Sequence, residues 1–200
     1  MEKVITKDGS VTFHNAEVDE TYHSVSGAKE ESVKKFIEPL GDLVNPKILD
    51  VCFGLGYNSA AALDHFKACK ITAIELDKNI LDKIKELDAP FESYAEIKEC
   101  VSKETEHVRL IIGDVLVEVD NLEDDYFDAV LFDPFSPSKS PELWSGEFFS
   151  KISSKVKKGG ILTTYSCAGK VRRALKEAGF EVSDGPCVGR RAPSTVAVKK

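Results

Sequence analysis

The sequence predicts an α/β protein whose core is an open, mostly parallel, seven-stranded sheet. Two observations support this prediction. From residue 46 onward, apolar runs typical of strands alternate with amphipathic stretches typical of helices. The first of these runs ends in the turn Gly54-x-Gly56, typical of a first strand that passes directly into a first helix. Strands that alternate with helices at this spacing form βαβ units with parallel strands.

We interpret residues 1–200 as one domain, in which a small N-terminal unit, residues 1–45, precedes the core, residues 46–200. The N-terminal unit opens with a segment that alternates around Asp8-Gly9, which predicts a small β-hairpin. Apolar residues at helical spacing then predict a helix over 28–40.

The core elements follow in regular alternation. The predicted strands lie near residues 47–51, 71–76, 108–112, 127–132, 160–165, 179–183 and 194–198. The predicted helices lie near residues 57–68, 78–88, 93–104, 145–156 and 168–178. The last two strands are short and separated by Gly185-Pro186, which predicts an antiparallel hairpin at the edge of the sheet.

The composition is that of an ordinary globular protein, with 42% hydrophobic and 30% charged residues. No apolar stretch approaches the roughly 20 residues that span a bilayer, and the N-terminus lacks a signal-peptide core. We therefore expect a cytoplasmic protein without a membrane partner. Its five cysteines and four histidines are dispersed and show no C-x-x-C spacing, so we expect no metal.

Charge is distributed unevenly along the chain. Residues 1–138 carry 14 Lys and Arg against 29 Asp and Glu, whereas residues 139–200 carry 13 against 5. An acidic protein with a basic C-terminal third can hold an anionic partner on one face. Chance placement of surface lysines would produce the same pattern.

The turn between Asp50 and Asn58 predicts a nucleoside-type cofactor. Gly54 and Gly56 allow the backbone to approach a ligand, and the absence of a following Lys-Ser/Thr pair excludes a P-loop. Ser59 occupies the position of the third glycine in the dinucleotide fingerprint, so that fingerprint fails.

Acidic residues end four of the predicted strands, where ligands of open α/β sheets bind: Asp50, Glu75, Asp114 and Asp133. Glu75 lies about 20 residues beyond the glycines, where a carboxylate typically binds ribose hydroxyls. Asp114 could accept a hydrogen bond from an exocyclic amine of the nucleoside base. Taken alone, an aspartate at this position is more typical of a helix N-cap. Carboxylates around a nucleoside favour S-adenosyl-L-methionine (AdoMet), which is cationic at sulfur and at its amino group. The predicted cofactor-binding residues are Asp50, Phe53, Gly54, Gly56, Asn58, Glu75, Asp114, Asp133 and Pro134.

Three stretches resemble the methyltransferase domain of the MnmC family: the proline-stiffened loop Asp133–Trp144, Tyr165–Phe180 and Gly189–Arg191. The resemblance covers roughly residues 20–192. Cys52 departs from the family of AdoMet-dependent methyltransferases, which usually has glycine there. The resemblance implies a Rossmann-like class I fold, AdoMet as cofactor and tRNA as partner. The implied reaction converts 5-aminomethyl(-2-thio)uridine at the wobble position to 5-methylaminomethyl(-2-thio)uridine.

The resemblance also implies roles for individual residues. Asp133 is the expected catalytic residue, which holds the attacking amine. Tyr22 is expected to help close the cofactor site. The expected substrate and tRNA contacts are Phe135, Lys139, Trp144, Tyr165, Lys170, Arg172, Arg173, Arg190 and Arg191. A solvated helix face is the alternative for Lys170 and the two arginines after it, and a core position is the alternative for Trp144.

No stretch of the sequence is left to supply the flavin domain that bifunctional MnmC members carry, so the resemblance implies a stand-alone methyltransferase. Two other functions remain open at this stage. One is a small-molecule amine methyltransferase or an aminopropyltransferase such as spermidine synthase. The other is a non-catalytic RNA-binding module on the same fold, whose mark would be loss of the strand-end acids.

Overall fold

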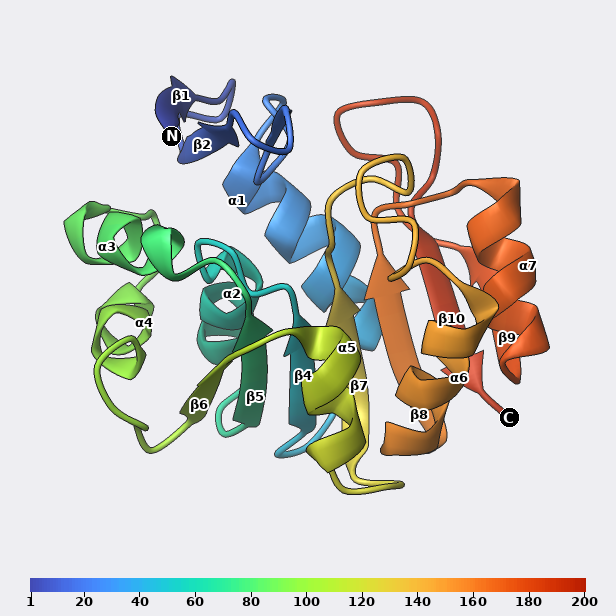
Figure 1. Ribbon diagram of the computed structural model, residues 1–200. Helices are drawn as coiled ribbons and strands as arrows, with labels where there is room; N and C mark the ends of the chain where they lie inside the picture. Colours follow the sequence, from blue (N-terminus) through green and yellow to red (C-terminus); the bar gives the residue numbers. More distant parts are fainter.

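The computed structural model describes residues 1–200 and contains a large and a small β-sheet (Figure 1). The large sheet has the strand order β6-β5-β4-β7-β8-β10-β9. Its strands are β4 (Lys47–Val51), β5 (Lys70–Glu75), β6 (Val108–Ile112), β7 (Phe127–Phe132), β8 (Val156–Thr164), β9 (Phe180–Asp184) and β10 (Thr195–Lys199). The small sheet has the order β1-β2-β3, formed by β1 (Glu2–Ile5), β2 (Val11–Asn15) and β3 (Glu20–Thr21).

The predicted Rossmann-like sheet is confirmed. Strands β4 to β8 pair in parallel, whereas β10 runs antiparallel to both of its neighbours, β8 and β9. The last strand of the chain thus lies inside the sheet, and β9 forms the edge. The strand order reverses beside β4, so the loops that leave β4 and β7 diverge and open a crevice at their carboxyl ends.

Helices cover both faces of the sheet. They are α1 (Ala28–Glu31), η1 (Ser32–Ile37), η2 (Glu38–Leu40), α2 (Tyr57–His65), α3 (Lys78–Glu86), α4 (Tyr94–Cys100), α5 (Val115–Glu118), η3 (Val119–Asn121), α6 (Gly146–Lys155) and α7 (Gly169–Glu177). One apolar cluster joins η1, α2, α3 and α4 to the sheet, and a second joins α5, α6 and α7 to its other face. No helix is both long and apolar enough to cross a membrane.

The predicted helix over 28–40 is helical throughout but irregular. An α-helical turn leads into the π-helical segment η1, and the 3-10 turn η2 ends it. Pro39 lies in η2 and lacks a backbone N–H, so regular α-helical hydrogen bonding cannot continue through it. Such π-helical turns occur frequently at functional sites.

The predicted N-terminal hairpin is also confirmed, with Glu2 paired to His14 and Ile5 to Val11. Gly9 adopts a positive φ of 82° in the turn. The short strand β3 extends the hairpin to three strands. The small sheet lies beyond the carboxyl ends of the large sheet (Figure 1). A 2.8 Å hydrogen bond from the Tyr57 hydroxyl to the Val11 carbonyl ties the two parts together.

Candidate active site

A cavity of about 830 Å³ lies between the strand ends and the N-terminal unit. Its walls come from the loops after β4, β5, β6, β7 and β8, from residues 15–26 and 31–35 of the N-terminal unit, and from residues 188–190 between β9 and β10. Ligand pockets commonly have volumes of about 300–1,000 Å³. The cavity is therefore large enough for a nucleoside cofactor together with part of a substrate.

The glycine turn places three alternate residues at positive φ: Cys52 at 66°, Gly54 at 56° and Gly56 at 73°. A Cβ on Gly54 would lie 3.2 Å from the Tyr22 ring, so this glycine keeps the turn close beneath that ring. A Cβ on Gly56 would lie 2.6 Å from Ile97. Gly56 thus serves internal packing, whereas Gly54 lies on the cavity wall.

Glu75 links the glycine turn to the end of β5. Its carboxylate accepts hydrogen bonds of 2.7 Å from the backbone N–H groups of Gly54 and Asp77. Burial raises the pKa of Glu75, and the two N–H donors oppose that effect by stabilising the charged form. Only 7% of Glu75 is exposed, yet it lines the cavity.

Asp133 follows β7 directly, and its half-buried side chain lies on the cavity wall. The Asn58 side-chain amide donates a 2.8 Å hydrogen bond to its Oδ2. Burial, reinforced by the negative charge of Glu31, raises the pKa of Asp133 well above its usual range. Asp133 is therefore an unusually strong proton acceptor for a carboxylate.

Asp114 is both a helix N-cap and a residue of the cavity wall. Its Oδ1 accepts a 2.9 Å hydrogen bond from the Leu116 N–H, which makes it the N-cap of α5. It also lines the cavity, beside the apolar side chains of Val115 and Leu116.

Asp50 lies behind the turn and does not reach the cavity. It is fully buried, and its Oδ2 accepts a 2.6 Å hydrogen bond from the Ser59 hydroxyl while its Oδ1 has no partner. Burial and the nearby charge of Glu75 raise the pKa of Asp50 to about 7. Asp50 thus connects β4 to α2 and supports the turn from below.

The structure brings part of the predicted residue set to the cavity. The lining residues are Phe53, Gly54, Glu75, Asp114, Asp133, Pro134, Phe135, Tyr165 and Arg190. Those outside the lining are Asp50, Gly56, Asn58, Lys139, Trp144, Lys170, Arg172, Arg173 and Arg191. Asn58 lies directly behind the wall, where it contacts Asp133.

Trp144 and Arg172 have internal partners. Trp144 is only 3% exposed, and its indole N–H donates a 2.8 Å hydrogen bond to the Phe135 carbonyl, so it supports the proline loop from below. Arg172 donates to the Thr195 hydroxyl and the Ser194 carbonyl at 3.0 and 2.9 Å. Lys170, Arg173 and Arg191 are exposed, and Lys139 lies 3.8 Å from Asp19.

Glu20 and Tyr22 close the cavity from the N-terminal side, and sequence reasoning singled out only Tyr22 for this role. The Glu20 carboxylate accepts a 2.9 Å hydrogen bond from the Ser136 N–H and a second bond from the Ser136 hydroxyl. Tyr22 packs its ring 5.2 Å from the Phe135 ring. No local pattern marks Glu20, because its partner lies 116 residues away.

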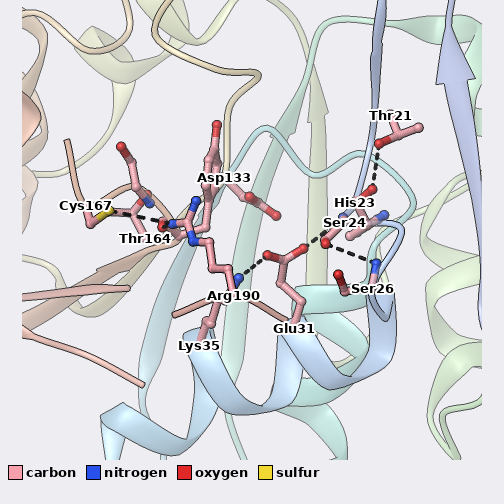
Figure 2. Close-up of polar contacts among 12 residues, drawn as sticks. Thr21, His23, Ser24, Ser26, Glu31, Lys35, Asp133, Thr164, Cys167 and Arg190 are labelled. Atoms are coloured by element: carbon pink, nitrogen blue, oxygen red, sulfur yellow. Dashed lines mark hydrogen bonds and ion pairs between the residues drawn. The ribbon is translucent and has the colours of Figure 1, made fainter. Parts of the chain in front are cut away.

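An ion pair between Glu31 and Lys35 was also missed. Both residues line the cavity, and Figure 2 shows their side chains turned toward the same space as Asp133. The pair follows the ordinary i,i+4 spacing of a helical surface, so the sequence alone does not distinguish it from a solvent-exposed pair.

The charge of the lining suits AdoMet. Eight carboxylate side chains line the cavity, against the two cationic side chains of Lys35 and Arg190. Such an excess attracts the cationic sulfur and amino group of AdoMet and would repel the pyrophosphate of a dinucleotide. No cluster of three or more His, Cys, Asp or Glu residues could hold a metal ion.

Comparison with known proteins agrees with this geometry. A family described as S-adenosyl-L-methionine-dependent methyltransferase matches residues 76–200. Fold and site together thus define an AdoMet-dependent methyltransferase. MnmC2 from Aquifex aeolicus is similar over 98% of this chain and 69% of its own, with 33% identity and a TM-score of 0.80. The chain belongs to the MnmC2-like methyltransferases, whose cofactor is AdoMet.

Two further relatives have related sequences. An uncharacterized protein from Methanocaldococcus jannaschii is 32% identical over 98% of this chain and 59% of its own length. The tRNA 5-methylaminomethyl-2-thiouridine biosynthesis bifunctional protein MnmC from Hahella chejuensis is 45% identical over 44% of this chain and 14% of its own. The chain therefore spans 59% or less of the length of these two relatives.

Proposed function

We propose that this protein is a cytoplasmic tRNA methyltransferase. The proposed reaction transfers a methyl group from AdoMet to the amine of 5-aminomethyl(-2-thio)uridine at the wobble position. The similarity to MnmC2 over nearly the whole chain carries this proposal. We propose that residues 1–200 act as a single methyltransferase unit.

We propose that the glycine turn and the acids after β5 and β6 hold the cofactor. Bound AdoMet supplies a methyl group on a cationic sulfur atom. Glu75 would accept from the ribose hydroxyls, and Asp114 from an exocyclic amine. The apolar side chains of Leu76 and Val115 line the same part of the cavity and would cover a base.

Asp133 is the proposed catalytic residue. Its Oδ2 is held by Asn58, so its remaining lone pairs can accept from the substrate amine and aim the nitrogen lone pair at the methyl carbon. Forming the N–C bond breaks the S–C bond and leaves an extra proton on the nitrogen. The raised pKa of Asp133 makes it a suitable acceptor for that proton.

Exposed basic side chains near the cavity would bind the tRNA backbone. Arg190 lines the cavity and donates to the Tyr165 carbonyl. Its loop, between β9 and β10, rises on the same side of the sheet as the loop after β7 (Figure 1). Lys170, Arg173 and Arg191 are exposed in the same C-terminal third.

The test is methyl transfer from labelled AdoMet to tRNA that carries 5-aminomethyluridine, followed by mass spectrometry of the digested tRNA. We expect 5-methylaminomethyluridine with the wild type and none with Asp133→Asn, which should still bind AdoMet in calorimetry. Labelling of small amines without labelling of tRNA would overturn the substrate assignment. Failure to bind AdoMet at millimolar concentration would overturn the enzymatic function.

A further inference from the structure

The ion pair of Glu31 and Lys35 is buried against the cavity rather than in the protein core. The Lys35 Nζ lies 2.6 Å from the Glu31 Oε1, and the two side chains are only 4% and 10% exposed. Both residues line the cavity. The same helical segment carries a second i,i+4 pair, Glu30 and Lys34, whose side chains are 39% and 48% exposed.

The buried pair retains unused hydrogen-bonding capacity. An ammonium group has three N–H donors, and the hydrogen bond to Glu31 occupies one donor of Lys35. The Glu31 Oε2 accepts a 2.9 Å hydrogen bond from the Ser24 N–H, and each carboxylate oxygen can accept more than one bond. A buried ion pair is weak support for stability, because desolvation opposes the attraction between its charges. Its position on a cavity wall therefore favours a role in ligand binding.

The pair lies close to the proposed catalytic residue. The charges of Glu31 and Lys35 both act on the Asp133 carboxyl, and the three side chains face one space (Figure 2). If the substrate amine contacts Asp133, the neighbouring atoms of the substrate ring would therefore lie against the Glu31–Lys35 pair. In 5-aminomethyluridine, the ring carbon that bears the aminomethyl group is bonded to C4, which carries a carbonyl oxygen and is followed by N3–H.

We propose that Lys35 and Glu31 read the polar edge of the uracil ring. Lys35 donates to the C4 carbonyl oxygen, and Glu31 accepts from N3–H. The Lys35 ammonium beside the Glu31 carboxylate thus matches the uracil edge, where a hydrogen-bond acceptor, the C4 oxygen, lies beside a donor, N3–H. Cytosine presents the opposite pattern, with an amino group at C4 and an unprotonated N3, so the pair selects against it. This inference rests on the proposed function and extends it to the choice of base.

The double variant Glu31→Gln/Lys35→Met tests the inference. It removes both charges together, so that neither charge is left buried without its partner. Substrates are anticodon stem-loop RNAs that carry either 5-aminomethyluridine or 5-aminomethylcytidine. We expect the wild type to prefer the uridine and the double variant to lose that preference by roughly 10- to 100-fold in kcat/KM. The midpoint of thermal unfolding and the AdoMet affinity should stay close to wild type.

The matched control is Glu30→Gln/Lys34→Met, which alters the exposed pair on the same segment and should leave the preference unchanged. A Glu31→Gln/Lys35→Met enzyme that keeps the wild-type preference would overturn the inference and leave the proposed function intact. No transfer to the uridine stem-loop by the wild type would instead overturn the proposed function.

A substrate-side measurement covers the case in which the double variant does not fold. A stem-loop with 5-aminomethyl-4-thiouridine replaces the C4 oxygen by sulfur, a weaker hydrogen-bond acceptor. The wild-type enzyme should lose roughly tenfold or more in kcat/KM on this RNA. Equal transfer to the oxygen and sulfur substrates would overturn the assignment of Lys35.

Discussion

The Tyr22 hydroxyl donates a 2.8 Å hydrogen bond to the Asp77 carboxylate across the glycine turn. Tyr22 comes from the N-terminal unit, and Asp77 follows β5, so the bond spans the proposed cofactor site. Burial and the negative charge of Asp77 raise the pKa of Tyr22, which keeps the phenol in its donating form. The N-terminal unit thereby covers the cavity on the side opposite the strand ends.

Removing that hydroxyl should weaken cofactor binding moderately. Tyr22→Phe keeps the ring against Phe135 and Gly54 but loses the hydrogen bond to Asp77, a type of bond that typically contributes about 0.5–1.5 kcal/mol, and a long 3.4 Å hydrogen bond from Asn15. Titration calorimetry should show AdoMet affinity reduced by roughly 2- to 12-fold. Tyr22→Ala also removes the ring and should cost more. Tyr126→Phe is the control, since this tyrosine lies outside the cavity lining and should bind AdoMet as the wild type does.

The two glycines of the turn should respond differently to alanine. Gly54→Ala places a Cβ 3.2 Å from the movable Tyr22 ring, so it should mainly reduce AdoMet affinity. Gly56→Ala places a Cβ 2.6 Å from Ile97 and 2.7 Å from Phe53, so it should mainly reduce the free energy of unfolding. Both also carry the cost of a left-handed non-glycine residue, about 1–2 kcal/mol.

Gly9→Ala isolates that backbone cost, because Gly9 has φ of 82° and no atom within 4 Å of its would-be Cβ. Chemical denaturation of the three variants should therefore rank Gly56→Ala as the least stable. Equal losses in all three would mean that the contacts of the turn contribute nothing beyond backbone strain.

The strand ends and the glycine turn were predictable because their signals are local. Apolar runs, an acid and two glycines within a few residues define where β4 ends. The direction of Asp50 was not predictable in the same way. Neighbouring side chains on a strand point to opposite faces, and Asp50 points to the side of α2, where Ser59 binds it.

The partners that hold the N-terminal unit over the cavity were beyond sequence reasoning for a different reason. That placement depends on pairs such as Glu20 with Ser136 and Tyr22 with Asp77, which lie 116 and 55 residues apart. The strand that carries Glu20 is only two residues long, so no periodicity marks it. The burial of Trp144 likewise follows from the packing of α6 and the proline loop, which no local pattern specifies.

The buried carboxyl of Asp50 should make stability depend on pH. Its pKa is about 7 in the folded protein, against an ordinary value of 3.8 for an aspartate side chain. Between these pH values the folded state binds more protons than the unfolded state, so the free energy of unfolding falls as pH rises through this window. One proton limits the slope to about 1.4 kcal/mol per pH unit.

Asp50→Asn should remove this contribution. Urea denaturation at pH 5 and pH 8 gives the free energy of unfolding of both proteins. The difference between wild type and variant at each pH measures the contribution of Asp50. We expect Asp50→Asn to gain stability relative to the wild type as pH rises, since its amide carries no charge to bury. A constant difference across the two pH values would contradict the raised pKa of Asp50.

The basic residues of the C-terminal third should separate into RNA-binding and structural groups. Arg191 is exposed, so Arg191→Gln should weaken tRNA binding and leave stability near wild type. If its guanidinium contacts one phosphate, the slope of log K against log salt should become shallower by about 0.7–0.9. Arg172→Gln removes a 2.5 Å ion pair with Asp184 and two hydrogen bonds, so it should lower stability and leave the salt slope unchanged. Filter binding across a salt series measures the slope, and thermal unfolding measures stability. A salt slope that changes only in Arg172→Gln would reverse the roles assigned to Arg191 and Arg172.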